Sequence, residues 1–282
     1  MWKVNTINIH FLDACNYMCK HCFVKKESNQ LSFDQMIKII DKIKEYFNEE
    51  QIYDGRINLA GGEPLLSKDI DRVIDYIFSK GIKVSVITNG FYLTKDFINR
   101  HKKQLCCIGI SVDSLKTNIN QLIGRCQKNG QTLETSQLIE ICKYIKSSGI
   151  KLKINTCVSK LNYKEDFRPF LEQVKPNRYK VLQMLCDDYD VINASNRINE
   201  SEMNEFVNLH KDYISVKETS QELKKSYLIV DSKGNLTYNN SHKSTYSIFD
   251  YKVSDILVYL NLDKEVFEKR YNEEYQHSTI NQ

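Results

Sequence analysis

The chain has 282 residues, of which 41% are hydrophobic and 27% are charged, and this composition and length fit one large globular domain. Its 40 basic and 36 acidic residues leave a formal net charge of +4, too small an excess to indicate a broad surface for duplex nucleic acid. No apolar run approaches the roughly 18 residues that a membrane-spanning helix needs, and the first residues lack a secretion signal, so we expect a cytoplasmic protein.

Strand and helix patterns alternate along the first two thirds of the chain, and the first helix pattern follows a capping box formed by Ser32 and Gln35. This alternation predicts an α/β fold with a mainly parallel sheet, either doubly wound or closed into a full or partial barrel. We expect the active site at the carboxyl ends of the strands. The predicted strands are residues 7–12, 57–60, 84–88, 108–112, 152–158 and 179–185, and the predicted helices are residues 33–47, 70–79, 138–145 and 166–174.

The pattern changes after about Cys186, where a polar stretch leads into further, differently arranged elements. We expect residues 1–186 to form the barrel and residues 187–282 to form a C-terminal extension that closes the active site. The predicted elements of this extension are a helix at 200–211, a hairpin of strands 227–230 and 236–238 around a turn at 231–235, and a last helix at 263–271.

Three cysteines follow the first predicted strand with the spacing C-x3-C-x2-C, namely Cys15, Cys19 and Cys22. Three thiolates in one short loop can bind three irons of a [4Fe-4S] cluster and leave the fourth iron open to another ligand. The alternative is a structural zinc site that also uses His21, but no second ligand pair follows at the usual distance. The remaining cysteines are expected to be core residues or unreactive thiols: Cys106, Cys107, Cys126, Cys142, Cys157 and Cys186.

The segment Gly61-Gly62-Glu63-Pro64 follows the second predicted strand. Glycines let the backbone approach a ligand closely, and Glu63 offers a carboxylate to an ammonium group. Alone, this segment predicts only a turn between a strand and a helix; next to the cysteine triplet it indicates a cofactor site. The Thr-Asn-Gly sequence at residues 88–90 predicts a turn that contributes wall contacts at most.

Two later strands carry polar residues on a face where a strand between helices should be apolar. Because side chains alternate along a strand, Lys153 and Asn155 share one face, and Arg178 and Lys180 share a face on the next strand. Adjacent strands could therefore present these four side chains to one interior volume, which would suit an anion. The alternative is that they are solvated charges at strand ends.

The cysteine triplet with Phe23 after it, together with the Gly-Gly-Glu-Pro segment, resembles the radical S-adenosylmethionine (SAM) superfamily. Residues 111–114, 122–125, 153–155, 178–181 and 226–231 further resemble its viperin-like enzymes, in order along the chain. The resemblance implies a partial (β/α)6 barrel with an appended C-terminal α+β cap, a [4Fe-4S] cluster on the three cysteines, and bound SAM. The matching cofactor-binding positions are Phe23, Gly61, Gly62, Glu63, Pro64, Ser111, Asp113 and Arg125, and the matching triphosphate-binding positions are Lys153, Asn155, Arg178 and Lys180.

The reaction implied by the resemblance is the dehydration of a nucleoside triphosphate (CTP, UTP or GTP) to its 3'-deoxy-3',4'-didehydro analogue. A 5'-deoxyadenosyl radical from SAM would remove the ribose 4' hydrogen, and the product would terminate viral polynucleotide chains. An external one-electron reductant is implied, and neither direct nucleic-acid binding nor a membrane is expected. The amphipathic N-terminal helix and the aromatic C-terminus of vertebrate members are missing, which suits a cytosolic prokaryotic enzyme.

Tyr227 matches a tyrosine that lies near the substrate in viperin-like enzymes, and a phenol can supply a proton or relay a hydrogen atom. Its alternative role is core packing, since buried aromatic rings usually stabilise strands.

Two other classes of function remain open. One is a different radical SAM enzyme, such as a peptide modifier or an activating enzyme, although a further cysteine-rich domain is missing; the other is a non-enzymatic iron-sulfur or zinc scaffold.

Overall fold

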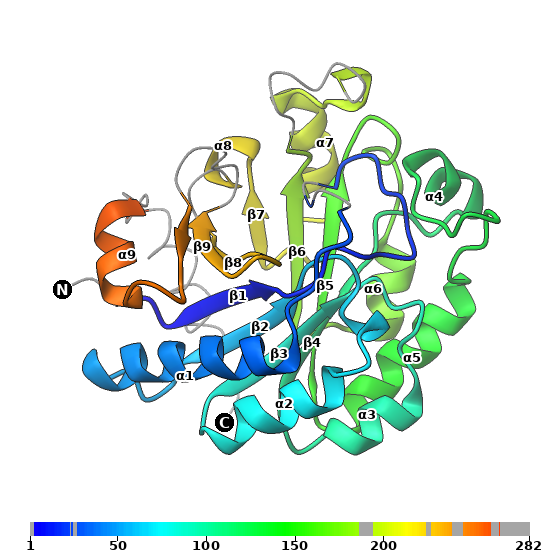
Figure 1. Ribbon diagram of the computed structural model, residues 1–282. Coiled ribbons are helices and arrows are strands. Elements are labelled where there is room, and N and C mark those ends of the chain that lie inside the picture. Colours follow the sequence, from blue (N-terminus) through cyan, green and yellow to red (C-terminus); the bar gives the residue numbers. More distant parts are fainter. Residues whose placement is uncertain are drawn as a thin grey trace.

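The computed structural model describes residues 3–22, 24, 27–185, 194–223, 227–238, 245–260 and 265. One curved sheet of ten strands runs through this part of the chain, in the order β10-β9-β8-β1-β2-β3-β4-β5-β6-β7 (Figure 1). Because β10 and β7 are its two ends, the sheet does not close on itself by backbone pairing. This confirms the expected partial barrel.

The six predicted strands form the centre of the sheet, and neighbouring strands among them are all parallel. Their carboxyl ends therefore meet along one edge, where an α/β fold places its site. The strands are β1 (Thr6–His10), β2 (Arg56–Ala60), β3 (Lys83–Thr88), β4 (Leu105–Ser111), β5 (Lys151–Val158) and β6 (Arg178–Gln183).

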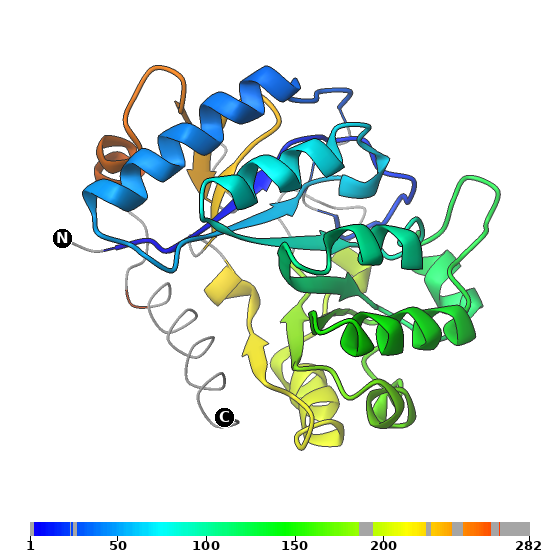
Figure 2. The same cartoon turned by 90° about the horizontal axis from the view of Figure 1, so that it is seen from below.

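Helices cover the outer face of this central sheet, and the view from below shows them arranged around its outside (Figure 2). The capping box at the start of the first helix is present: Ser32 Oγ accepts from the Gln35 backbone at 3.2 Å, and the Gln35 side chain accepts from the Ser32 backbone at 2.9 Å. The helices that follow the central strands are α1 (Phe33–Glu49), η1 (Pro64–Leu66), α2 (Ile70–Ser79), α3 (Lys95–His101), α4 (Thr117–Ile123), α5 (Thr135–Ser147) and α6 (Arg168–Val174). Of these, η1, α3 and α4 were not predicted, since short helices carry little periodicity.

The strands between the helices are not apolar on both faces. On β5 the alternate residues Leu152, Ile154 and Val158 are fully buried in the hydrophobic core, whereas Lys153 and Asn155 face a cavity on the inner side. The same alternation separates core from cavity on β1 and β2. The inner face of the sheet therefore carries polar side chains among apolar ones, and an apolar core lies behind it.

The C-terminal segment extends the same sheet at both ends. One strand adds in parallel to β6, another adds in parallel to β1, and the predicted hairpin is confirmed by the antiparallel pairing of the next strand. The expected boundary at residue 186 and, apart from Glu265, the predicted helix at 263–271 lie outside the described residues. The elements of this segment are η2 (Ala194–Asn196), α7 (Glu200–Leu209), β7 (Val216–Glu218), α8 (Ser220–Leu223), β8 (Leu228–Val230), β9 (Asn235–Tyr238), β10 (Tyr246–Ser247) and α9 (Val253–Leu260).

The prediction that no segment spans a membrane is tested over the part of the chain given above. Within it, none of the helices combines the length and the apolar character that crossing a bilayer would require.

Candidate active site

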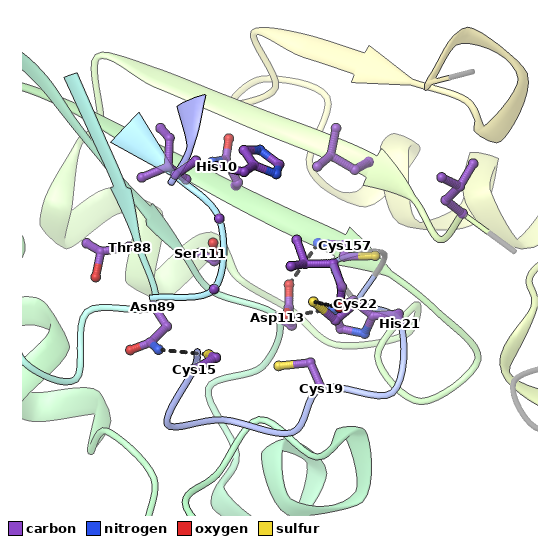
Figure 3. Close-up of a pocket in the computed structure, with 18 of the residues that line it drawn as sticks. His10, Cys15, Cys19, His21, Cys22, Thr88, Asn89, Ser111, Asp113 and Cys157 are labelled. Carbon is purple, nitrogen blue, oxygen red and sulfur yellow. Dashed lines mark hydrogen bonds and ion pairs between the residues drawn. The ribbon is translucent and has the colours of Figure 1, made fainter. Parts of the chain in front are cut away.

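A cavity of about 300 Å³ opens at the carboxyl ends of the central strands. Each of the six central strands contributes a side chain or its last residues to the wall, and the cysteine loop after β1 closes one side (Figure 3). The opposite side is lined by residues of the C-terminal segment, among them Leu223, Tyr227 and Ile229. The cavity thus has a cysteine side and a C-terminal side.

All three predicted cluster ligands, Cys15, Cys19 and Cys22, line this cavity, and none of the three is in a disulfide bond. Figure 3 shows them on one loop, facing the same space as Ser111 and Asp113. Burial raises the pKa of Cys19 to about 12. A thiolate at this position therefore needs the positive charge that bound iron supplies.

Three thiols on one loop are the donor set that a [4Fe-4S] cluster takes from a protein. Within the ranges that the structure covers, no three His, Cys, Asp or Glu side chains converge as ligands of one ion would. A [4Fe-4S] cube instead distributes its three thiolates over three different irons. The fourth candidate zinc ligand, His21, directs Nε2 toward Asp113 Oδ2 at 3.3 Å.

The Gly-Gly-Glu-Pro segment packs directly on the chain that leads into the cysteine loop. The Gly62 backbone donates to Leu12 O at 2.8 Å, and the Glu63 backbone donates to Ala14 O at 2.8 Å. A Cβ atom on Gly62 would lie 2.0 Å from Ala14 O, and Gly61 has a φ of +122°. The glycines are thus required by contact with the chain's own backbone, while both also line the cavity.

Glu63 is completely buried, and its carboxylate is held by other parts of the protein. It accepts hydrogen bonds from Thr88 Oγ1 at 2.6 Å, from the Asn89 backbone at 2.7 Å and from the Leu65 backbone at 3.1 Å. Burial raises the pKa of this carboxyl group, and the three donors act against that rise. Glu63 therefore ties β2 to β3. Neither Glu63 nor Pro64 is among the residues that line the cavity. Their contact with SAM stays a prediction.

Asn89 supports the cysteine loop, although the sequence indicated only a turn there. Its Nδ2 donates to Asn16 Oδ1 at 2.7 Å and lies 3.9 Å from Cys15 Sγ. The available signal was an amide directly after a parallel strand, where side chains of neighbouring strands meet. Asn89 lines the cavity wall, as the sequence allowed, but its support of the cysteine loop was not predicted.

A buried charge network joins the cysteine loop to the end of β4. Asp113 accepts from Arg125 Nη1 at 3.2 Å and from the Cys157 backbone at 2.9 Å. Burial acts to raise the pKa of Asp113, but Arg125 and His21 outweigh it and hold the pKa at about 2. The carboxylate is therefore ionised near neutral pH.

The guanidinium of Arg125 spans several segments of this network. Besides Asp113 it donates to the backbone oxygens of Ser111 and, at 3.3 Å, Asn89. Ser111, Asp113 and Arg125 all line the cavity, as expected of cofactor-binding positions. Their hydrogen bonds hold the loops together, and their contacts with SAM stay predictions.

Lys153, Asn155 and Lys180 line the cavity on its β5 and β6 side. In the strand register Lys153 lies beside Arg178, and Asn155 lies beside Lys180. The register therefore places the four residues on adjacent strands, and three of them line the cavity, whereas Arg178 is not among its lining residues. Their contacts with a triphosphate stay predictions. The last predicted cofactor residue, Phe23, lies outside the described residues.

Polar residues on β1 and β2 complete this inner face and were missed. Asn58 Nδ2 donates to Asn8 Oδ1 at 3.0 Å, and Asn8 Nδ2 donates to Leu228 O of β8 at 3.0 Å. Burial lowers the pKa of His10 to about 4, so this cavity-lining imidazole is neutral near pH 7. The polar alternation that revealed Lys153 and Asn155 also occurs in these two strands and could have found them.

On the C-terminal side, Tyr227 meets Lys180 and a carboxylate that the sequence did not indicate, Glu218. Lys180 Nζ lies 2.5 Å from Glu218 Oε1 and donates to the Tyr227 hydroxyl at 2.5 Å. Tyr227 in turn donates to Glu218 Oε2 at 2.8 Å. Lys180 and Tyr227 line the cavity, so this hydrogen-bonded triad borders the space in which a substrate would lie.

Comparisons with known proteins agree with this geometry. A family model described as the Radical SAM superfamily matches residues 9–174. A relative from Lacinutrix mariniflava, named S-adenosylmethionine-dependent nucleotide dehydratase, is 33% identical over 95% of this chain, which spans 58% of that relative's length. A relative of the same name from Flammeovirga pacifica is 31% identical over 95% of this chain and 92% of its own length.

A solved structure supports the fold. SuiB from Streptococcus suis bound to S-adenosylmethionine is similar with a TM-score of 0.69 at 16% identity, over 94% of this chain and 67% of SuiB.

Proposed function

The chain belongs to the radical SAM superfamily, and we propose on that basis that it is a dehydratase that acts on a nucleoside triphosphate. The viperin-like resemblance in the sequence is confirmed by relatives that carry the name nucleotide dehydratase over nearly the whole chain. The observation that carries the substrate class is the polar, basic inner face of the sheet beside the cysteine loop.

The cofactors follow from the family and from the cysteine side of the cavity. Cys15, Cys19 and Cys22 would hold the [4Fe-4S] cluster, and the cavity that they line would take SAM. Together they supply, when bound, the one-electron chemistry that removes a hydrogen atom from the substrate. The protein's own contribution is to hold the reacting groups in line and to keep water away from them.

The triphosphate is placed by charge. Lys153 and Lys180 present two ammonium groups to the cavity, Asn155 adds an amide, and Arg178 lies beside Lys153 on the next strand. A triphosphate offers several negative charges and many acceptor oxygens to the cations that line the cavity, and charge-assisted hydrogen bonds of this kind are strong. This leaves the ribose on the side of the cluster, where its 4' hydrogen can be removed.

The product we propose is the 3'-deoxy-3',4'-didehydro nucleotide, formed by loss of the ribose 4' hydrogen and of the 3' hydroxyl as water. The balance requires one further electron and a proton, and the external electron comes from a one-electron reductant. Tyr227 lines the cavity and holds a hydroxyl hydrogen, so it is the group we assign to proton or hydrogen-atom delivery. A nucleotide without a 3' hydroxyl terminates polymerisation, which supports an antiviral role.

The test is turnover by the reconstituted, reduced enzyme with SAM and each of the four nucleoside triphosphates in turn. We expect 5'-deoxyadenosine in every active mixture and a nucleotide product lighter by one water with at least one substrate. The variant in which Cys15, Cys19 and Cys22 are all alanine should make neither compound. If the parent enzyme forms 5'-deoxyadenosine but leaves all four nucleotides unchanged, the proposed substrate class is wrong.

A further inference from the structure

The edge strands of the sheet are β10 and β7, and β7 is not paired with β8. Glu218 is the last residue of β7, and Tyr227 directly precedes β8. β7 pairs with β6 and β8 pairs with β1, so these two residues reach each other from opposite ends of the central sheet. Glu218 and Tyr227 lie nine residues apart, near the two ends of the segment that joins β7 to β8, and their side chains meet next to the cavity.

The directions of the hydrogen bonds in this contact are fixed by chemistry. An ammonium group can only donate and a carboxylate can only accept, so Lys180 donates to both partners and Glu218 accepts from both. The Tyr227 oxygen accepts from Lys180, and its hydrogen is directed to Glu218 Oε2 at 2.8 Å. The carboxylate of Glu218 therefore decides where the phenol hydrogen lies.

Because both side chains are buried, the negative charge of Glu218 interacts strongly with the ammonium group of Lys180. Lys180 is 2% exposed and Glu218 is 4% exposed. A buried ammonium without a counter-charge is strongly disfavoured, and attraction between buried charges is poorly screened. Glu218 thus offsets the same positive charge that we assign to the triphosphate, and an anion in the cavity must share Lys180 with it.

We propose that Glu218 is a positioning residue that directs the Tyr227 hydroxyl and weakens anion binding at Lys180. The expected effect of Glu218 on product formation rests on the proposed function, whereas its expected effect on anion binding does not. In this arrangement Glu218 lowers the affinity for the substrate. It also raises the amount of didehydro nucleotide formed per 5'-deoxyadenosine, because it orients the Tyr227 hydroxyl. An ion pair that only held Lys180 would also weaken anion binding, but it would leave the use of the Tyr227 hydroxyl unchanged.

The first measurement is anion binding by the cluster-loaded protein, with inorganic tripolyphosphate as the probe. Glu218→Gln keeps the size and an acceptor oxygen but removes the negative charge. We expect it to bind tripolyphosphate about tenfold more tightly in calorimetric titration, which is the typical effect of one charge-assisted hydrogen bond. Affinity equal to or weaker than the parent's contradicts the proposal.

The second measurement is the ratio of didehydro nucleotide to 5'-deoxyadenosine, with a nucleotide that the parent turns over. Glu218→Gln should lower this ratio at least severalfold, because the phenol is no longer held by a carboxylate. In a Tyr227→Phe background the same change should lower it no further, since Glu218 acts on this ratio through Tyr227. Independent, additive losses would show that Glu218 does not act through the phenol.

Glu165→Gln is the matched control. Glu165 is also a buried carboxylate, and it accepts from Ser114 Oγ at 2.6 Å and from the Leu115 backbone at 2.8 Å, but it does not line the cavity. This variant should keep the parental tripolyphosphate affinity and the parental product ratio. If it reproduced both changes, general loss of a buried carboxylate would explain them and the proposal would be overturned.

Glu218→Asp keeps the inference testable if the glutamine variant does not fold. It retains the charge that offsets Lys180 but draws the carboxylate away from the phenol, so tripolyphosphate affinity should stay parental while the product ratio falls. A parental ratio in this variant contradicts the proposal. If the parent makes no didehydro nucleotide, the proposed function fails, whereas the tripolyphosphate titration still decides the role of Glu218 at Lys180.

Discussion

The two sides of the cavity are built in different ways. On the cysteine side, the backbones of residues 12–14 and 62–63 are hydrogen-bonded to each other, and a glycine allows their close approach. On the C-terminal side, Lys180, Glu218 and Tyr227 meet through side chains across a sheet that stays open. The first side is suited to hold a cluster rigidly, and the second is suited to rearrange around a substrate. Separate changes on the two sides should therefore have separable effects.

The largest expected effect is loss of the cluster on the cysteine side. Cys19→Ala removes one of three thiolate ligands, so iron and sulfide analysis should show no stable [4Fe-4S] cluster and no SAM cleavage. Cys106→Ala, which changes a thiol outside the cavity, should keep the cluster. A full cube in the triple alanine variant of Cys15, Cys19 and Cys22 would falsify the ligand assignment.

The next prediction compares a buried carboxylate on the cysteine side, Asp113, with one on the C-terminal side, Glu218. Asp113→Asn leaves Arg125 without its buried counter-charge and should cost about 3–5 kcal/mol of unfolding free energy, with poorer cluster retention. Glu218→Gln should leave the iron content at the parental level. Equal iron loss in both variants would mean that the two sides are not independent.

Gly62→Ala tests the backbone contact itself. The added Cβ would lie 2.0 Å from Ala14 O, and a backbone atom cannot rotate away, so we expect a loss of up to about 3 kcal/mol in chemical denaturation. The control is Gly81→Ala, where no atom lies within 4 Å and only the positive φ of +69° disfavours alanine. A cost of about 1 kcal/mol is expected there. Equal costs at the two positions would argue against the tight contact.

On the anion side, Lys153→Ala should weaken tripolyphosphate binding about ten- to hundredfold, the effect of losing a charge-assisted hydrogen bond of roughly 1.5–3 kcal/mol. Iron content should not change. Lys151→Ala is the control because this lysine is exposed at the start of the same strand. If both variants lost affinity equally, the effect would be one of overall charge rather than of the cavity.

The smallest effect on the folded protein is expected for Tyr227→Phe, which keeps the ring and removes only the hydroxyl. The variant should hold its cluster, bind tripolyphosphate and begin to cleave SAM, yet form much less didehydro nucleotide per 5'-deoxyadenosine. Mass spectrometric quantification of both products measures this ratio. A parental ratio and rate would make Tyr227 a structural residue and require another donor.

Much of the site followed from short stretches of sequence. The three cluster ligands lie within eight residues of one loop, so their spacing alone brings them together. The inward direction of Lys153, Asn155 and Lys180 followed from strand alternation, and the register confirmed which of them are neighbours. Asn8 and Asn58 also stand at alternate positions of buried strands, so the same pattern predicts that they face the cavity, although they were not among the predicted residues.

The sequence by itself therefore determined the cluster motif, the parallel α/β sheet and its polar inner face, because these depend on residues close together or at a fixed period. Only the tertiary structure decided that Glu63 binds Thr88 and Asn89, and that Glu218 lies between Lys180 and Tyr227. The reason is physical: a buried carboxylate takes the donors that folding brings within hydrogen-bonding distance. Lys180 and Tyr227 are 47 residues apart, and no local pattern records how β7 and β8, which are not paired with each other, are placed.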